Sequence, residues 1–382
     1  MHLKSNINKM YLLKAVKWFM IIMPIIVLFF EEHGLSLTQI MILQATYSFT
    51  VALFEIPSGF FADIYGRRLS LFYGSIFIFI GYLIFSFFSG FNEFFIAEIF
   101  LGIGGSLVSG ADSAIIYDTL LELKEDEDYT KIEGRNYGIG NVSEGIAGIL
   151  GGFLALTSLD LPVYIQTFVM FFSIPISYSL IEPKSSYKLA KSLNSILIIV
   201  KETFLDNNKL KWYIIYSSAM GIGTLSIAWF VQPFLIELQT PLVYYGIIWA
   251  SLNIIAGITS YYSYLFNNNN LLIYISLLMI ISFICLGLNI TIYGLIFIVL
   301  IYIIRGVITP NLRNLINVNS TSERRATVLS LRSFMIRISF AIIAPILGYI
   351  TDSYNISYVF YVLAIIVGLT SLLAVYKLKI NN

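Results

Sequence analysis

The chain has 382 residues, of which 58% are hydrophobic and only 12% are charged, and its mean hydropathy is +0.83. This composition excludes an ordinary water-soluble domain, in which about 45–50% of residues are apolar. A formal net charge of +1 argues against a nucleic-acid partner. The single cysteine, Cys285, excludes an intrachain disulfide.

Twelve mainly apolar runs are long enough to cross a bilayer, whose core of roughly 30 Å takes about 20 residues of helix. The first run is followed by Glu31 and Glu32 without a cleavage pattern, so it is typical of a retained helix rather than a signal peptide. The runs are 15–30, 40–62, 69–89, 94–117, 137–159, 161–181, 212–236, 241–266, 271–289, 290–310, 326–350 and 354–376. The sequence therefore predicts an all-α membrane protein with twelve transmembrane helices.

The basic residues predict the orientation, because Lys and Arg near the ends of membrane helices tend to stay in the cytoplasm. With a cytoplasmic N-terminus, the outward connections fall near 31–38, 90–93, 158–162, 237–241, 289–292 and 351–354. None of the 23 Lys and Arg residues lies in them, and the group from Lys4 to Lys17 falls on the inward side. We therefore expect a multi-pass protein of the inner, cytoplasmic membrane with both termini in the cytoplasm.

The longest polar connection lies at the midpoint of the chain. It predicts an N-terminal six-helix bundle over 1–182, a central cytoplasmic loop over 183–211 and a C-terminal six-helix bundle over 212–382. Inside the loop, Leu193, Ile196, Val200 and Phe204 recur at helical spacing. This spacing is consistent with a helix on the inner membrane surface or with a solvated linker.

A short polar stretch, GFFADIYGRR, ends the second apolar run. Asp63 and Arg67 are four residues apart, so they can pair across one turn if the helix continues to Tyr65. Gly59 would allow close approach of a neighbouring backbone, and Gly66 would permit the following turn. This pattern predicts a latch between helices at the cytoplasmic mouth.

The same stretch resembles the signature between helices two and three of the major facilitator superfamily, in which Gly, Asp and Gly-Arg-Arg/Lys recur at this spacing. The resemblance implies two pseudo-symmetric six-helix bundles, and the nearest members are efflux-like transporters of drugs or metabolites. It also implies an inner gate, to which Asp118 would contribute from the end of the fourth helix. The gate residues are Gly59, Asp63, Gly66, Arg67, Arg68 and Asp118. A second copy of the signature is missing from YSYLFNNNNLL.

Acidic residues inside the membrane invite functional hypotheses, since each costs about 2.5–3.5 kcal/mol on insertion scales. Glu144 is the first candidate for proton coupling because it lies nearest mid-membrane. Glu98 and Asp112 are further candidates on one predicted stripe of the fourth helix, and Glu55 is expected to assist the gate. The alternatives are a protonated carboxyl hydrogen-bonded between helices or an ion pair with Arg135.

The second half carries no acid inside its predicted spans. Arg332 and Arg337 are candidates for gate contacts, or else they reach lipid phosphates. Four residues are candidates for lining a substrate cavity: Tyr47, Asn141, Trp229 and Tyr261.

The sequence contains no Walker A, CxxC, HExxH or Gly-x-Ser-x-Gly pattern, so we expect no enzyme activity, no cofactor and no metal. We expect a monomeric secondary transporter whose partners are a small solute, protons and the lipid bilayer. Proton-coupled export of lipophilic or cationic compounds is the first functional hypothesis. An acidic, aromatic first half without a basic residue at mid-depth disfavours anionic substrates. The alternatives are proton-coupled uptake of a neutral metabolite or sugar, and a non-transporting membrane sensor or assembly partner.

Overall fold

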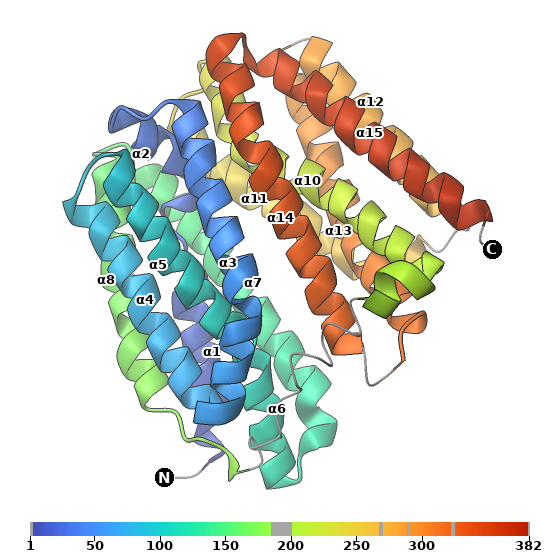
Figure 1. Ribbon diagram of the computed structural model, residues 1–382. Helices are drawn as coiled ribbons and strands as arrows, with labels where there is room; N and C mark the ends of the chain where they lie inside the picture. The colour runs from blue at the N-terminus through green and yellow to red at the C-terminus, as the bar shows by residue number, and fades with distance from the viewer. Residues whose placement is uncertain (1–2, 185–200, 267–269, 289, 322–324, 381–382) are drawn as a thin grey trace. The chain divides into compact units, whose positions relative to one another are not determined.

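The chain is built from helices in the computed structural model, which describes residues 3–184, 201–266, 270–288, 290–321 and 325–380 (Figure 1). Its α-helices are α1 (Ser5–Trp18), α2 (Ile26–Glu32), α3 (Leu37–Tyr65), α4 (Arg67–Phe87), α5 (Phe91–Ser109), α6 (Asp112–Leu123), α7 (Tyr129–Leu154), α8 (Asp160–Tyr178), α10 (Asn208–Glu237), α11 (Val243–Tyr261), α12 (Leu271–Leu288), α13 (Gly294–Val318), α14 (Arg325–Ser353) and α15 (Ile356–Ile380). No strand occurs in these ranges.

Eleven stretches within the described ranges are long and apolar enough to cross a membrane. Two of them contain two α-helices each, namely Ser5–Glu32 and Phe91–Leu123. Helix α7 adds a long helix that is rich in glycine and polar residues, and it occupies the fifth position along the chain. The predicted fold class, an all-α membrane protein with room for twelve crossings, is confirmed.

Two of these apolar stretches are interrupted between their helices. Between α1 and α2 the backbone leaves the α-helix at Phe19 and continues through a 3₁₀ turn, Met23–Ile25, that contains Pro24. Between α5 and α6 the break falls at Gly110 and Ala111. The predicted continuous stripe from Glu98 to Asp112 is therefore wrong, because Asp112 begins a separate helix.

The chain divides into two compact units. Unit 1 comprises Met1–Leu35, Thr46–Ala190 and Pro241–Ala250, and unit 2 comprises Ser36–Ala45, Lys191–Thr240 and Ser251–Asn382. The division into two bundles at a loop over 183–211 stays a prediction. The interpretation of Leu193, Ile196 and Val200 as a surface helix or a linker lies outside the described residues.

Unit 1 packs its helices closely where small residues meet. A side chain at Gly104 of α5 would lie 2.8 Å from the carbonyl oxygen of Gly74 in α4, and one at Gly74 would lie 3.0 Å from the carbonyl oxygen of Gly104. Removing the side chain from both positions lets the two backbones touch. This contact holds α4 and α5 together on the side of unit 1 that carries the gate signature.

Unit 2 is organised around α10, whose residues Phe230 and Phe234 are fully buried. The hydroxyl of Tyr216 donates a 2.8 Å hydrogen bond to the carbonyl of Leu272 at the start of α12. Because the Tyr216 ring is fully buried, its hydroxyl would be an unsatisfied polar group in the core without this hydrogen bond.

Asp352, near the end of α14, caps the first turn of α3 within unit 2. Its Oδ1 accepts a 3.1 Å bond from the backbone N–H of Leu37, and its Oδ2 accepts bonds from the N–H and the hydroxyl of Thr38 at 2.8 and 2.5 Å. These N–H groups have no partner within their own helix, and a carboxylate suits the positive end of a helix.

Candidate functional site

The predicted pairing of Asp63 with Arg67 is present. Helix α3 reaches Tyr65, and an oxygen of Asp63 lies 2.6 Å from Nη1 of Arg67. The Nε of Arg67 lies 3.8 Å from a carboxylate oxygen of Asp118 on α6. Only 16% of the Arg67 side chain and 10% of the Asp118 side chain are exposed, so this guanidinium links the end of α3 to α6 in a largely desolvated setting.

Gly66 forms the turn between α3 and α4 with a φ of +101°. Side chains avoid this backbone region, which explains why a glycine stands there. A Cβ at this position would also lie 2.7 to 2.9 Å from the carboxylate of Glu182. Gly66 therefore gives both the turn and the space for that carboxylate.

Glu182 completes this cluster, and the sequence analysis did not single it out. Its two oxygens accept hydrogen bonds from the backbone N–H groups of Arg67 and Arg68 at 2.7 and 2.6 Å. The side chain of Arg68 turns toward α8, where its Nε donates to the carbonyl of Tyr178 at 3.1 Å and its guanidinium lies 5.0 Å from the Tyr178 ring centre. An acid directly after the sixth apolar run, next to Pro183, was the available signal. We call Asp63, Arg67, Asp118 and Glu182 the inner cluster.

Gly59, at the start of the signature, and Glu55, one turn before it, are not part of the inner cluster. Within the described residues, no atom lies within 4 Å of a Cβ built on Gly59, so the close backbone approach predicted there is not observed. Glu55 is half-buried, and its carbonyl accepts a hydrogen bond from Ser58 at 3.1 Å, next to Pro57 inside α3.

Glu98 is the most deeply buried of the candidate acids, with 3% of its surface exposed. It interacts electrostatically with Tyr82 of α4, as does Tyr47 of α3. One turn further along α5, Gly102 brings that helix against Tyr47 and Thr50. The structure thus brings Glu98 and Tyr47 together, two residues predicted for different roles.

Asp112 stands at the first turn of α6, facing α1 and α7. One of its oxygens lies 3.4 Å from Nζ of Lys14, and the other accepts a 2.8 Å bond from the N–H of Ser113. The hydroxyl of Ser113 donates in turn to Glu133 of α7 at 2.7 Å. Glu144 lies further along α7 and is half-buried.

Lys17 corrects an expectation drawn from the sequence. The first span runs over Ser5–Glu32 rather than beginning at residue 15, so Lys14 and Lys17 lie well inside it and Lys17 is near its middle. The ammonium of Lys17 is shielded from solvent. The first half therefore does contain a basic residue, Lys17, that is buried within a candidate membrane span.

The family profile that matches this sequence is the Major Facilitator Superfamily, over residues 11–317. The chain belongs to this superfamily.

Solved structures of other proteins share its fold over nearly the whole length. The nucleoside transporter NupG aligns with a TM-score of 0.78 and 14% identity, covering 99% of this chain and 100% of its own. A POT family transporter in complex with 5-aminolevulinic acid aligns with a TM-score of 0.77 and 14% sequence identity, covering 99% of this chain and 97% of its own. A D-xylose–proton symporter aligns with a TM-score of 0.76 and 13% sequence identity, covering 96% of this chain and 95% of its own. No curated protein matches the chain.

The Major Facilitator Superfamily fold explains the place of the inner cluster. The stretch GFFADIYGRR covers the end of the second span, the turn at Gly66 and the start of the third span, as the resemblance implied, and Asp118 lies beyond the break in the fourth span. Sequence identities of 13–14% establish the fold alone, so the substrates of these transporters are not transferred to this chain.

The arginines predicted as gate contacts of this Major Facilitator Superfamily protein lie in unit 2, on α14. Nε of Arg332 donates a hydrogen bond to the hydroxyl of Ser217 on α10. Arg337 is half-buried further along the same helix. A role of either residue in a gate stays a prediction.

The four residues predicted to line a substrate cavity are divided between the units. Tyr47 and Asn141 belong to unit 1, where the Asn141 amide donates to the carbonyl of Tyr137 at 3.1 Å. Trp229 and Tyr261 belong to unit 2. Trp229 is half-buried in α10, whereas 74% of Tyr261 is exposed at the end of α11.

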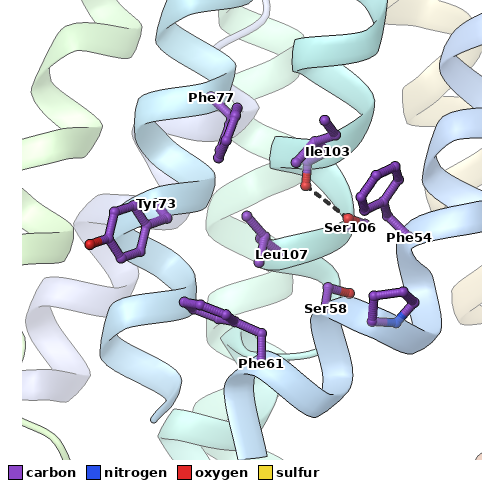
Figure 2. A pocket seen from close by; sticks show the side chains of 9 residues that line it. Phe54, Ser58, Phe61, Tyr73, Phe77, Ile103, Ser106 and Leu107 are labelled. Atoms are coloured by element: carbon purple, nitrogen blue, oxygen red, sulfur yellow. Dashed lines mark hydrogen bonds between the residues drawn. The ribbon is translucent and has the colours of Figure 1, made fainter. Parts of the chain in front are cut away.

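A pocket of about 340 Å³ lies among α3, α4 and α5 of this Major Facilitator Superfamily protein (Figure 2). Phe54 and Phe61 line it from α3, Phe77 from α4, and Leu107 from α5. The hydroxyl of Ser106 is turned to the carbonyl of Ile103, with a bond of 2.8 Å. This apolar lining offers no carboxylate or basic group, so the charged chemistry of unit 1 lies elsewhere.

Proposed function

We propose that this protein is a secondary active transporter that moves a small solute by alternating access and couples that movement to protons. Membership of the superfamily and the multi-pass fold make it a transporter rather than an enzyme. The observation that supports alternating access most directly is the inner cluster, in which one arginine and two backbone amides connect α3, α4, α6 and the chain after α8. Charged contacts of this kind can be made in one state and broken in another.

The inner cluster is the proposed gate. Arg67 meets two carboxylates, and its removal would leave Asp118, which is 7% exposed, without that cation. Uncompensated buried charges are strongly unfavourable, so Arg67→Ala should destabilise the arrangement in which α3 and α6 are joined.

Cysteine labelling tests the gate. In a Cys285→Ser background, Asn141→Cys provides an exposed reporter on α7. We expect Arg67→Ala to change its labelling rate from the cytoplasmic side, whereas Lys124→Ala, an exposed cation of the same half, leaves the rate unchanged. Equal rates in wild type and Arg67→Ala would show that the cluster is structural only.

Glu144 is the proposed proton carrier, with Glu98 and Asp112 as the other candidates. A carboxyl that alternates between a buried and a hydrated setting can bind and release a proton in each cycle. Glu144 is half-buried on α7, which is compatible with exchange between these settings. Asp112 already has Lys14 at 3.4 Å.

Export is the proposed direction, and uptake of a neutral metabolite or sugar is the alternative. We propose a monomer in the inner, cytoplasmic membrane with both termini in the cytoplasm. The proposal of lipophilic or cationic substrates rested on an acidic, aromatic first half without a basic residue at mid-depth, and the buried Lys17 within the first candidate span weakens the second of these grounds.

Inverted vesicles from cells that overproduce the protein test this function. With an acid interior, we expect gradient-driven uptake of at least one compound from a panel of lipophilic cations, sugars and aromatic carboxylates. Glu144→Gln should lose this uptake, and Glu127→Gln, which changes an exposed acid, should keep it. Uptake only into right-side-out vesicles would support the import alternative. If the folded protein takes up none of these compounds in either inverted or right-side-out vesicles, the remaining hypothesis is a non-transporting sensor or assembly partner.

A further inference from the structure

Lys17 is a buried cation for which the described chain gives no hydrogen-bond partner. Its Nζ is inaccessible to solvent and makes no hydrogen bond. It lies close enough to Asp112 and Lys14 to interact electrostatically with both, but Asp112 already has Lys14 at 3.4 Å. A buried charge is costly unless it is paired and hydrogen-bonded, so an anionic group bound here would compensate the ammonium.

Asn136 is a buried amide on α7, the helix that packs against α1. The residue is fully buried, and both atoms of its amide are without a hydrogen-bond partner in the described chain. It lies one helical turn before Gly140 on the same face of α7. A Cβ at Gly140 would lie 3.3 Å from Cε of Lys14, so this face of α7 packs against the lysine-bearing side of α1.

Two aromatic rings lie beside Lys14. Trp18 and Tyr137 meet edge to face with ring centres 6.3 Å apart, and Nζ of Lys14 lies 4.8 Å from the Trp18 ring centre. More than half of Tyr137, 59%, is exposed. A solute bound beside Lys14 would therefore have a flat apolar surface available for its body.

We propose that the polar cluster of Lys14, Lys17, Asp112 and Asn136 is a binding site for an aromatic monocarboxylate. The solute carboxylate accepts hydrogen bonds from the ammonium of Lys17 and the amide of Asn136, and its ring lies against Trp18 and Tyr137. Asp112 holds Lys14 in place and disfavours solutes with a second negative charge. All four cluster residues lie in unit 1.

This inference rests on the proposed transport function, and it names the substrate class of the same half. A lipophilic cation is disfavoured at this position because its charge would face Lys14 and Lys17. A neutral sugar would leave the ammonium uncompensated. A carboxylate satisfies the cation and the amide at once.

The test compares three probes of one shape and three charges: benzoate, benzamide and benzylamine. Binding to the purified full chain in nanodiscs is measured from the shift of the unfolding midpoint with probe concentration. We expect benzoate to bind, and we expect Lys17→Met to weaken it roughly 10- to 100-fold, as for loss of a charge-assisted hydrogen bond. Lys17→Arg should retain most of the affinity.

Lys9→Met is the matched control, because Lys9 lies on the same helix and donates to the carbonyl of Ser179 instead. It should bind benzoate as wild type does. Methionine at position 17 keeps the length of the side chain and removes a buried charge, so the variant is expected to fold. Asn136→Leu, which removes the amide, should weaken benzoate binding independently.

The proposal is overturned if benzamide or benzylamine binds as tightly as benzoate, if Lys17→Met keeps wild-type affinity, or if benzoate, phenylacetate and 4-hydroxybenzoate all fail to bind. The vesicle assay separates this inference from the proposed function. Proton-driven uptake that persists in Lys17→Met overturns the site and leaves the transporter. Benzoate binding that depends on Lys17, without flux of any solute, keeps the site and removes the transporter.

Discussion

Replacing Glu182 by alanine should loosen the first turn of α4. Its two oxygens accept the backbone amides of Arg67 and Arg68 at 2.7 and 2.6 Å. Loss of a helix cap costs about 0.5–2 kcal/mol. Because this cap serves two amides and carries a negative charge at the positive end of the helix, we expect the upper value, about 2 kcal/mol. At about 1.4 kcal/mol per factor of ten, this corresponds to a roughly 30-fold change in the local opening equilibrium.

Amide hydrogen exchange measures this opening directly. The peptide that begins at Arg67 should exchange its first two amides roughly 30-fold faster in Glu182→Ala. Glu182→Gln keeps one acceptor oxygen, so its effect should be intermediate, at about 1 kcal/mol or roughly fivefold. Glu127→Ala removes an exposed acid from the same half and should change nothing. Wild-type exchange in Glu182→Ala would refute the reasoning, since it would mean that water replaces the carboxylate without loss.

Two further substitutions probe turns and caps. Gly66→Ala places a Cβ 2.7 Å from Glu182 in a positive-φ backbone, so the unfolding midpoint in detergent should fall by the equivalent of about 1–3 kcal/mol. Gly59→Ala, with no described atom within 4 Å, is its control, and equal midpoints for the two variants would contradict the prediction. Asp352→Asn removes the charge that caps α3, so exchange at the first amides of α3 should rise roughly two- to fivefold. Unchanged exchange there would show that the charge is not needed.

The gate signature was readable from the sequence because its chemistry is local. Asp63 and Arg67 are four residues apart, and α-helical geometry alone brings residues at that spacing together. The structure places them 2.6 Å apart. The fold class was equally readable, because a run of about 20 apolar residues has few stable arrangements other than a membrane helix.

Glu182 could not be assigned in this way. It contacts the start of α4 across 115 residues of chain, and no periodicity relates the two positions. Lys17 was missed for a different reason. Lys17 already lay within the predicted run 15–30, but lysines near the start of a membrane helix commonly reach the interface, so only the tertiary structure shows that its ammonium is shielded from solvent.

The sequence by itself determined the membrane class, the order of the spans and the residues of the signature, since hydropathy and short helical spacing act within a few turns of chain. Only the tertiary structure decided which acid caps α4, where the first and fourth spans break, and that Lys17 of α1 and Asn136 of α7 have buried polar atoms without a hydrogen-bond partner in the described chain. Those features depend on contacts between distant segments, in which desolvation and hydrogen bonding are set by packing rather than by the neighbouring sequence.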